Sequence, residues 1–216
     1  AIHLAGDQHL ASCIRYGVSE FRDAGVAFAG PAVANTWPRR WYPPMAGGGE
    51  PVSPHKGTGD YIDGFGNRMT VLAVANPTVT GKQPARLYDR GPGWGLVILD
   101  NVNRTATFEC WPRYSQPTSP KAQQYPGWPI TVTQESLDGR SPYSHLPEIA
   151  ALEVDRIITV IRLNPKLPEE RETIYSWRLR SGAAWSPPVY SAGDYLMEKR
   201  VESEGSVTTS EVINVS

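Results

Sequence analysis

The 216-residue sequence predicts an α/β fold that is rich in strands. The run from Ile2 to Ala5 is apolar, which is typical of the end of a buried strand. It breaks at Gly6 into polar side chains, and in open α/β sheets ligands bind just outside the carboxyl ends of strands. Twenty glycines and twenty prolines are too many for a helical protein, so strands and loops should dominate.

Asp7 and His9 follow that first strand directly. Residues two apart on an extended backbone point to the same side, so we expect the carboxylate and the imidazole to face one point. Gly6 has no Cβ and would allow a sharp turn there. A set of oxygen and imidazole ligands suits zinc or another hydrolytic transition metal, and it does not indicate a thiolate site. The alternative is a hydrogen-bonded turn in which Asp7 caps the next segment and His9 is an ordinary polar residue.

A second candidate site lies after the short strand predicted over residues 26–29. It concentrates aromatic and guanidinium groups, namely Trp37, Arg39, Arg40, Trp41 and Tyr42. Arg39 and Arg40 are candidate substrate contacts, because guanidinium groups bind phosphate oxygens bidentately. A surface loop in which arginine stacks on tryptophan explains the same residues. The three aromatic rings also suit stacking on sugars, so a non-catalytic, β-rich binding module for a carbohydrate or a partner remains a second hypothesis.

Strand patterns continue through the rest of the chain. Residues 70–75 form an apolar run, and residues 94–99 and 105–111 flank five turn-forming residues, which predicts a hairpin. Residues 173–180 alternate, with Tyr175, Trp177 and Leu179 on one face and Ser176, Arg178 and Arg180 on the other, as in a half-buried antiparallel strand. Because the pattern changes after Pro147, we expect one domain over residues 1–146 and a small β-rich module over 147–216.

The composition limits the partners of the chain. A net charge of −1 creates no long-range field of one sign, so neither nucleic-acid nor membrane attraction is predicted. No apolar run approaches the roughly 18 residues of a transmembrane helix. Cys13 and Cys110 lie among apolar residues, which favours buried free thiols, although a disulfide between them stays open. We expect His3, His55 and His145 to be structural or exposed.

Five short motifs carry a family resemblance: residues 6–11 (GDQHLA), 31–35 (PAVAN), 37–39 (WPR), 63–70 (DGFGNRMT) and 109–113 (ECWPR). Together they resemble the PhoD-like metallophosphatases, the alkaline phosphatase D family, over most of residues 1–145 and more loosely beyond. The resemblance implies the C-terminal part of a metallophosphoesterase α/β/β/α sandwich, followed by a small all-β module.

The resemblance also implies a function, which is hydrolysis of phosphate monoesters or diesters by metal-activated water. Asp7 and His9 would then be metal ligands of a site for two divalent or trivalent ions such as Fe, Ca, Zn or Mn. The substrate would be a phosphorylated small molecule or a phosphodiester, and the location periplasmic or extracellular. The earlier metal-binding motifs of the family have no counterpart here, so we expect the missing N-terminal half of the catalytic domain to be a necessary partner. The serine nucleophile elbow and the phosphate-binding P-loop motif are both absent from the sequence.

Overall fold

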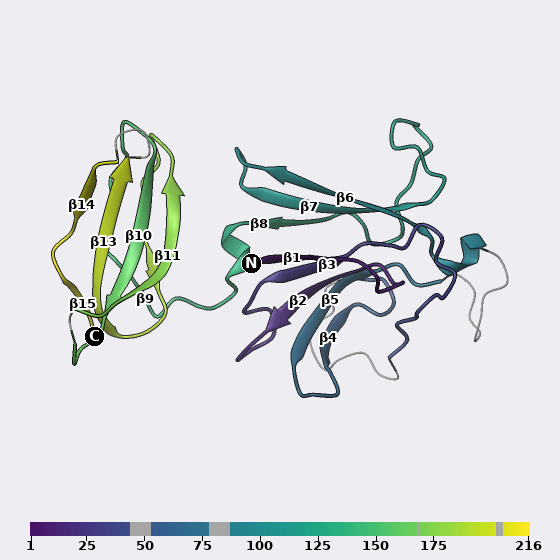
Figure 1. The fold of residues 1–216 in the computed structure, drawn as a ribbon, viewed down its shortest axis with the longest axis horizontal. Helices are drawn as coiled ribbons and strands as arrows, with labels where there is room; N and C mark the ends of the chain where they lie inside the picture. The colour runs from purple at the N-terminus through teal and green to yellow at the C-terminus, as the bar shows by residue number, and fades with distance from the viewer. Residues whose placement is uncertain (44–52, 78–86, 168, 202–204) are drawn as a thin grey trace. The chain divides into compact units, whose positions relative to one another are not determined.

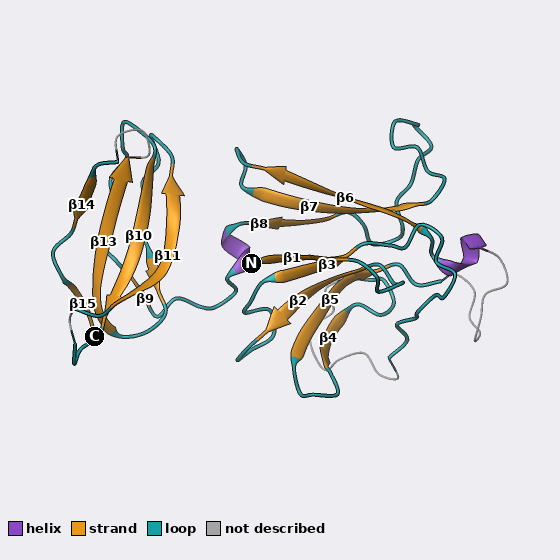
Figure 2. Ribbon diagram, viewed as in Figure 1, coloured by secondary structure: helices purple, strands orange, loops and turns teal. Residues whose placement is uncertain are grey.

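The computed structural model describes residues 1–43, 53–77, 87–167, 169–201 and 205–216. These residues divide into two compact units, Ala1–Arg140 (unit 1) and Ser141–Ser216 (unit 2). Among the described elements, all are strands except two short 3-10 helices, η1 (Leu87–Arg90) and η2 (Glu135–Leu137) (Figure 2). Neither of these helices is long and apolar enough to cross a membrane.

The prediction of an α/β fold is therefore wrong. The described part of the chain contains no α-helix, and it does not form an α/β/β/α sandwich. The physical reason is the length and period of the apolar runs, which are short and closed by glycine or proline, whereas α-helices average about three turns. Ser12–Gly17, for example, form a strand in which Cys13 is fully buried in the core.

Unit 1 contains a five-stranded sheet of order β1-β3-β2-β5-β4 and a three-stranded sheet of order β6-β7-β8. β1 pairs with β3 in parallel, and the other pairings described in these two sheets are antiparallel. Figure 1 shows the two sheets facing each other within this unit. The strands are β1 (Ile2–Ala5), β2 (Ser12–Gly17), β3 (Val26–Ala29), β4 (Gly59–Ile62), β5 (Arg68–Val74), β6 (Gly93–Asp100), β7 (Thr105–Pro112) and β8 (Ile130–Thr133).

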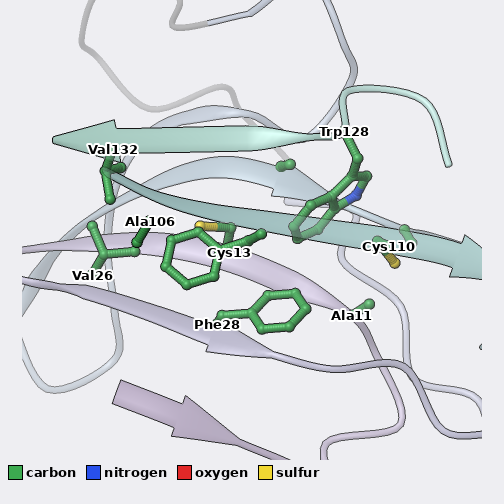
Figure 3. Packing of buried hydrophobic residues seen from close by; sticks show 11 residues of the cluster. Ala11, Cys13, Val26, Phe28, Ala106, Cys110, Trp128 and Val132 are labelled. Carbon is green, nitrogen blue, oxygen red and sulfur yellow. The ribbon is translucent and has the colours of Figure 1, made fainter. Parts of the chain in front are cut away.

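The core of unit 1 lies between these two sheets. The ring of Phe28 on β3 packs against Phe108 on β7 and Trp128 before β8, with centroid distances of 5.4 and 5.5 Å. Figure 3 shows Phe28 and Trp128 in this cluster, with Cys13 and Cys110 nearby. A Cβ added at Gly95 would lie 2.7 Å from Cζ of Phe28, so the glycine in β6 leaves the space that this ring fills.

The two cysteines are free and buried, which confirms the favoured interpretation of the sequence. Desolvation by the core raises the pKa of the Cys13 thiol, and likewise that of Cys110, to about 12. Because the thiolate is the reactive form of cysteine, neither side chain is a nucleophile at neutral pH.

The predicted hairpin is confirmed by the pairing of β6 with β7, in which Val97 lies opposite Phe108 and Leu99 opposite Ala106. The carboxylate of Asp100 closes the turn by accepting hydrogen bonds from the backbone N–H groups of Val102 and Asn103.

Unit 2 has a separate core beneath a sheet of order β11-β10-β13-β14, with β15 also paired to β13. On β11, Trp177 is partly covered and stacks on Trp185 at 5.6 Å, while its neighbours Ser176 and Arg178 are exposed. Leu179 is buried, so the predicted alternation is confirmed over these four strand residues. The strands are β9 (Ser144–His145), β10 (Arg156–Leu163), β11 (Arg171–Leu179), β12 (Pro188–Val189), β13 (Gly193–Val201), β14 (Val207–Thr209) and β15 (Ile213–Val215).

β1 is a strand as predicted, but it is not buried. It lies at an edge of the five-stranded sheet, and the side chain of Leu4 is 63% exposed. An apolar sequence alone does not distinguish a central strand from an edge strand, because that distinction depends on which neighbours pair with it.

A buried carboxylate, Asp23, organises the loop between β2 and β3. It accepts hydrogen bonds from the backbone N–H groups of Val18, Ser19 and Glu20 at 2.6 to 2.9 Å. The N–H of Glu20, followed by that of Val18, holds the pKa of Asp23 below its ordinary value of 3.8. Hydrogen bonds to the ionised carboxylate favour the charged form, so this loop is tied to ionisation of Asp23.

We expect acid to loosen this loop through Asp23. Since its pKa is lower in the folded than in the unfolded state, its stabilisation is complete above the unfolded value near 3.8 and is lost as the pH falls through the lower folded value. Urea unfolding measured from neutral pH into this acid range should show the loss, and Asp23→Asn should reduce the pH dependence. Glu20→Gln is the control, because the Glu20 side chain is exposed. An unchanged acid dependence in Asp23→Asn would contradict the assignment.

Candidate metal centre

The sheet topology brings the carboxyl ends of three strands of unit 1 to the same end of the five-stranded sheet. β3 runs parallel to β1, and β5 runs in the same direction because β2 is antiparallel to both β3 and β5. The segments that leave the carboxyl ends of these strands therefore start at the same end of the sheet, with β2 between β3 and β5. They carry Asp7 and His9 after β1, Trp37 and Arg39 after β3, and Asn76 after β5.

Asp7 and His9 converge as predicted, although by a different backbone geometry. His9 Nε2 lies 3.7 Å from Asp7 Oδ1. The backbone is not extended here, because Asp7 and His9 adopt φ values of 59° and 54°. Gly6 does not supply this left-handed conformation, since its own φ lies outside that region. Aspartate and histidine enter this region more readily than most residues, and such conformations cluster at functional sites.

The imidazole of His9 is oriented by the segment that follows β3. Its Nδ1 lies 2.9 Å from the carbonyl oxygen of Trp37. A carbonyl can only accept a hydrogen bond, so Nδ1 carries the proton, and in the neutral ring Nε2 presents its lone pair. A backbone carbonyl on the other ring nitrogen is also the usual way in which metal-binding histidines are held.

This arrangement sets two acceptors, Nε2 of His9 and Oδ1 of Asp7, toward each other. The Asp7 side chain is fully exposed and that of His9 partly covered. A cation placed between these two atoms would be attracted by the lone pairs of both. Two ligand atoms about 2.1 Å from a tetrahedral ion lie roughly 3.4 Å apart, which is close to the distance in this loop.

Arg39 lies against the same loop. Its backbone N–H donates to the carbonyl oxygen of His9 at 3.3 Å, and its Nη1 donates to Oε1 of Gln8 at 3.1 Å. The structure therefore brings Arg39 together with the residues that flank the candidate ligands. Gln8 is a contact that the sequence interpretation missed, because its partner Arg39 lies 31 positions away in the chain.

Arg40 has a different environment from Arg39. Its Nε and Nη2 atoms are buried and have no hydrogen-bond partner within the described part of the chain. A buried guanidinium donor without an acceptor is costly in free energy.

The aromatic patch is only partly available to a ligand. Trp41 is held by structure: its Nε1 donates to the Gly57 carbonyl at 2.8 Å, and the Asn76 side chain bonds both the N–H and the C=O of Trp41. Trp37 is 71% exposed, and Tyr42 is exposed but donates its hydroxyl to a backbone carbonyl. Asn76 acts here by positioning the segment that carries the arginines.

The candidate centre brings together two candidate ligands, Asp7 and His9. Across the residues with described positions, no group of three or more His, Cys, Asp or Glu side chains is arranged to hold a metal ion. Of the other histidines, His3 lies on β1, is exposed and sits 3.5 Å from the hydroxyl of Tyr16. His55 and His145 are exposed at other places, as expected.

Comparisons with known proteins found no match to this chain among protein-family models, curated proteins or solved structures.

Proposed function

We propose that this protein takes part in metal-dependent hydrolysis of phosphoric esters, with Asp7 and His9 as two of the metal ligands. The observation that carries the proposal is the pair of acceptors, Asp7 Oδ1 and His9 Nε2, which face each other at 3.7 Å while the Trp37 carbonyl fixes the proton on the other ring nitrogen. A carboxylate oxygen and an imidazole nitrogen are a donor set that zinc and similar hydrolytic metals use.

The neighbouring arginines support a phosphate ester as the substrate class. Arg39 is hydrogen-bonded to Gln8 and to the backbone of His9, in the loop that carries the candidate ligands. Its charge therefore stays at this end of the sheet. Arg40 contributes buried donors that have no acceptor among the described residues. Guanidinium groups match the geometry of phosphate oxygens, so the two residues would bind and orient the substrate.

The chemistry that a bound metal supplies is polarisation of the phosphoryl group and activation of water. The residues of this chain have separate tasks. Asp7 and His9 hold the ion, the carbonyl of Trp37 keeps the imidazole in the required tautomer, and Arg39 offsets the negative charge of the substrate. Two protein ligands do not complete a hydrolytic site, so the proposal requires further ligands from residues outside this pair.

Zinc binding tests the ligand assignment. We expect added Zn²⁺ to shift the ring nitrogen resonances of His9 in the ¹⁵N-labelled 216-residue chain. The affinity should be weak, because water must complete the coordination sphere. Asp7→Asn should lower the affinity by about tenfold, since it removes the charge opposite the dication, and His9→Ala should abolish the response.

Two matched controls distinguish this site from adventitious binding. Asp138→Asn removes an exposed carboxylate that pairs with Arg140, and His145→Ala removes an exposed histidine of unit 2. Both variants should bind zinc as the original chain does. If zinc instead shifts His145 or His55 and leaves His9 unchanged, the ligand assignment is wrong, and the binding-module hypothesis built on the exposed rings of Trp37 and Tyr42 replaces it.

Hydrolysis is the second readout. With two ligands, the chain alone should cleave a generic phosphodiester no faster than buffer containing the same metal. A form of the protein that does hydrolyse such esters should lose its rate by orders of magnitude in Asp7→Asn and in His9→Ala. Retention of that rate in both variants would overturn the proposed function.

A further inference from the structure

Unit 1 contains a cleft that shares no residue with the Asp7–His9 loop. It has a volume of about 710 Å³ and lies beside β8, where the three-stranded sheet faces β2 and β5. This volume falls within the range of small-molecule sites in proteins, roughly 300 to 1,000 Å³. Its charged and polar lining comes mainly from Arg15, His55, Trp128 and nearby hydroxyl groups.

Arg15 supplies a positive charge to this cleft. Arg15 lies on β2, where it pairs with Val26 of β3. It is three positions after Ser12, the first residue of the strand. Its Nε donates to the carbonyl oxygen of Ala24 at 3.3 Å, whereas its Nη2 is buried without a partner in the described part of the chain. Arg15 takes no part in the ion pair of Asp60, because that carboxylate accepts two hydrogen bonds from the guanidinium group of Arg22.

The electrostatic setting of Arg15 is unfavourable for a cation. Burial, with the positive charge of Arg22 as the smaller cause, lowers the pKa of Arg15. A guanidinium group stays protonated in proteins, so the side chain keeps a charge that its surroundings destabilise. An anion placed against Arg15 would offset this cost, and the partly desolvated setting would strengthen the attraction.

Trp128 provides a second unpartnered donor. The residue is 8% exposed, its ring packs on Phe28, and its Nε1 has no acceptor among the residues that the structure describes. Figure 3 shows Trp128 entering the core just before β8, above Phe28. Both orphaned nitrogens are covered from solvent, so a ligand reaches Arg15 Nη2 only when the flexible arginine side chain turns toward the cleft.

The remaining wall is apolar and carries no carboxylate among the lining residues described. Leu72, Ile130 and Val132 line it. Leu72 occupies a bulge of β5, where Val71 pairs with Ile14 and Ala73 with Cys13, so Leu72 has no partner on β2. Bulges redirect side chains in this way, and this one places an aliphatic side chain beside the arginine.

We propose that this cleft binds a small organic anion. Its carboxylate or phosphate head would accept hydrogen bonds from the guanidinium of Arg15, and its apolar body would pack on Leu72 and Val132 beside the ring of Trp128. Ligand sites of this kind combine mainly apolar walls with a few polar groups that fix orientation.

The experiment compares three probes on the ¹⁵N-labelled 216-residue chain: benzoate, phenyl phosphate and the neutral benzyl alcohol. We expect the two anions to shift the Trp128 indole N–H, the Arg15 Nε–H and the backbone N–H of Leu72, and benzyl alcohol to bind much more weakly. The tighter of the two anions identifies the head group. Equal affinity for benzyl alcohol would overturn the proposal in favour of an apolar cavity, and so would the absence of shifts at these three groups.

Two variants complete the test. Arg15→Gln should weaken anion binding about tenfold or more, because it removes a charge-assisted hydrogen bond. Lys56→Gln removes an equal charge from an exposed position next to His55 and should leave the affinity unchanged. An Arg15→Gln protein that is folded and binds both anions normally would overturn the proposal. Should that variant not fold, the shifts of Arg15 Nε–H in the original chain decide the question without it.

Discussion

Replacement of Phe108 by alanine is expected to lower the free energy of unfolding of unit 1 by about 3–5 kcal/mol. Phe108 on β7 is completely buried and packs its ring 5.4 Å from that of Phe28, which in turn contacts Trp128. Truncation removes a large apolar side chain from the layer between the two sheets. The strands on either side are held by their backbone pairing and cannot collapse fully into the space, so a cavity cost adds to the lost burial.

Urea unfolding, followed through protection of backbone amides on β7 from hydrogen exchange, measures this effect within unit 1. Phe65→Ala is the matched control, because Phe65 belongs to the same unit and is 95% exposed. The control should change stability by no more than about 0.5 kcal/mol. A loss of the same small size in Phe108→Ala would contradict the assignment of this cluster as the core.

Replacement of Asp60 by alanine is the second change with a large expected effect, about 2–4 kcal/mol. Asp60 on β4 is buried and accepts hydrogen bonds from Arg22 Nε and Nη2, at 3.2 and 3.0 Å, and from the buried Thr70 hydroxyl at 2.5 Å. Loss of the carboxylate leaves the guanidinium and the hydroxyl without this acceptor. Removal of one partner from a buried ion pair costs about 3–5 kcal/mol, and the partial exposure of Arg22 reduces that figure.

The same unfolding measurement on Asp138→Ala provides the control, since the Asp138–Arg140 pair joins two more exposed side chains. Its effect should be below about 1 kcal/mol. Asp60→Asn separates charge from hydrogen bonding, because the amide oxygen still accepts a hydrogen bond while the charge opposite Arg22 is gone. If Asp60→Ala costs no more than Asp138→Ala, the network around Arg22 does not stabilise unit 1.

The sequence alone predicted those features that depend on neighbouring residues. The β6–β7 hairpin follows from two β-prone runs joined by a short turn, and Asp100 closes it through contacts only two and three residues away. The alternation on β11 follows from the period of a strand. The proximity of the Asp7 and His9 side chains was also predicted, but from an extended backbone, whereas both residues adopt left-handed φ values.

The tertiary structure decided the features that depend on residues far apart in the chain. Whether β1 is an edge strand depends on which strands pair with it, and whether the layers are helices or sheets depends on what covers each apolar face. The tautomer of His9 is set by a backbone carbonyl 28 positions away in the sequence. The cleft is lined by both Arg15 and Trp128, which are separated by more than half of the sequence of unit 1. Local pattern fixes the backbone period, whereas pairing and burial are properties of the folded chain, and it is the pairing of β2 with β5 that places the partly buried Arg15 in the same cleft as Leu72.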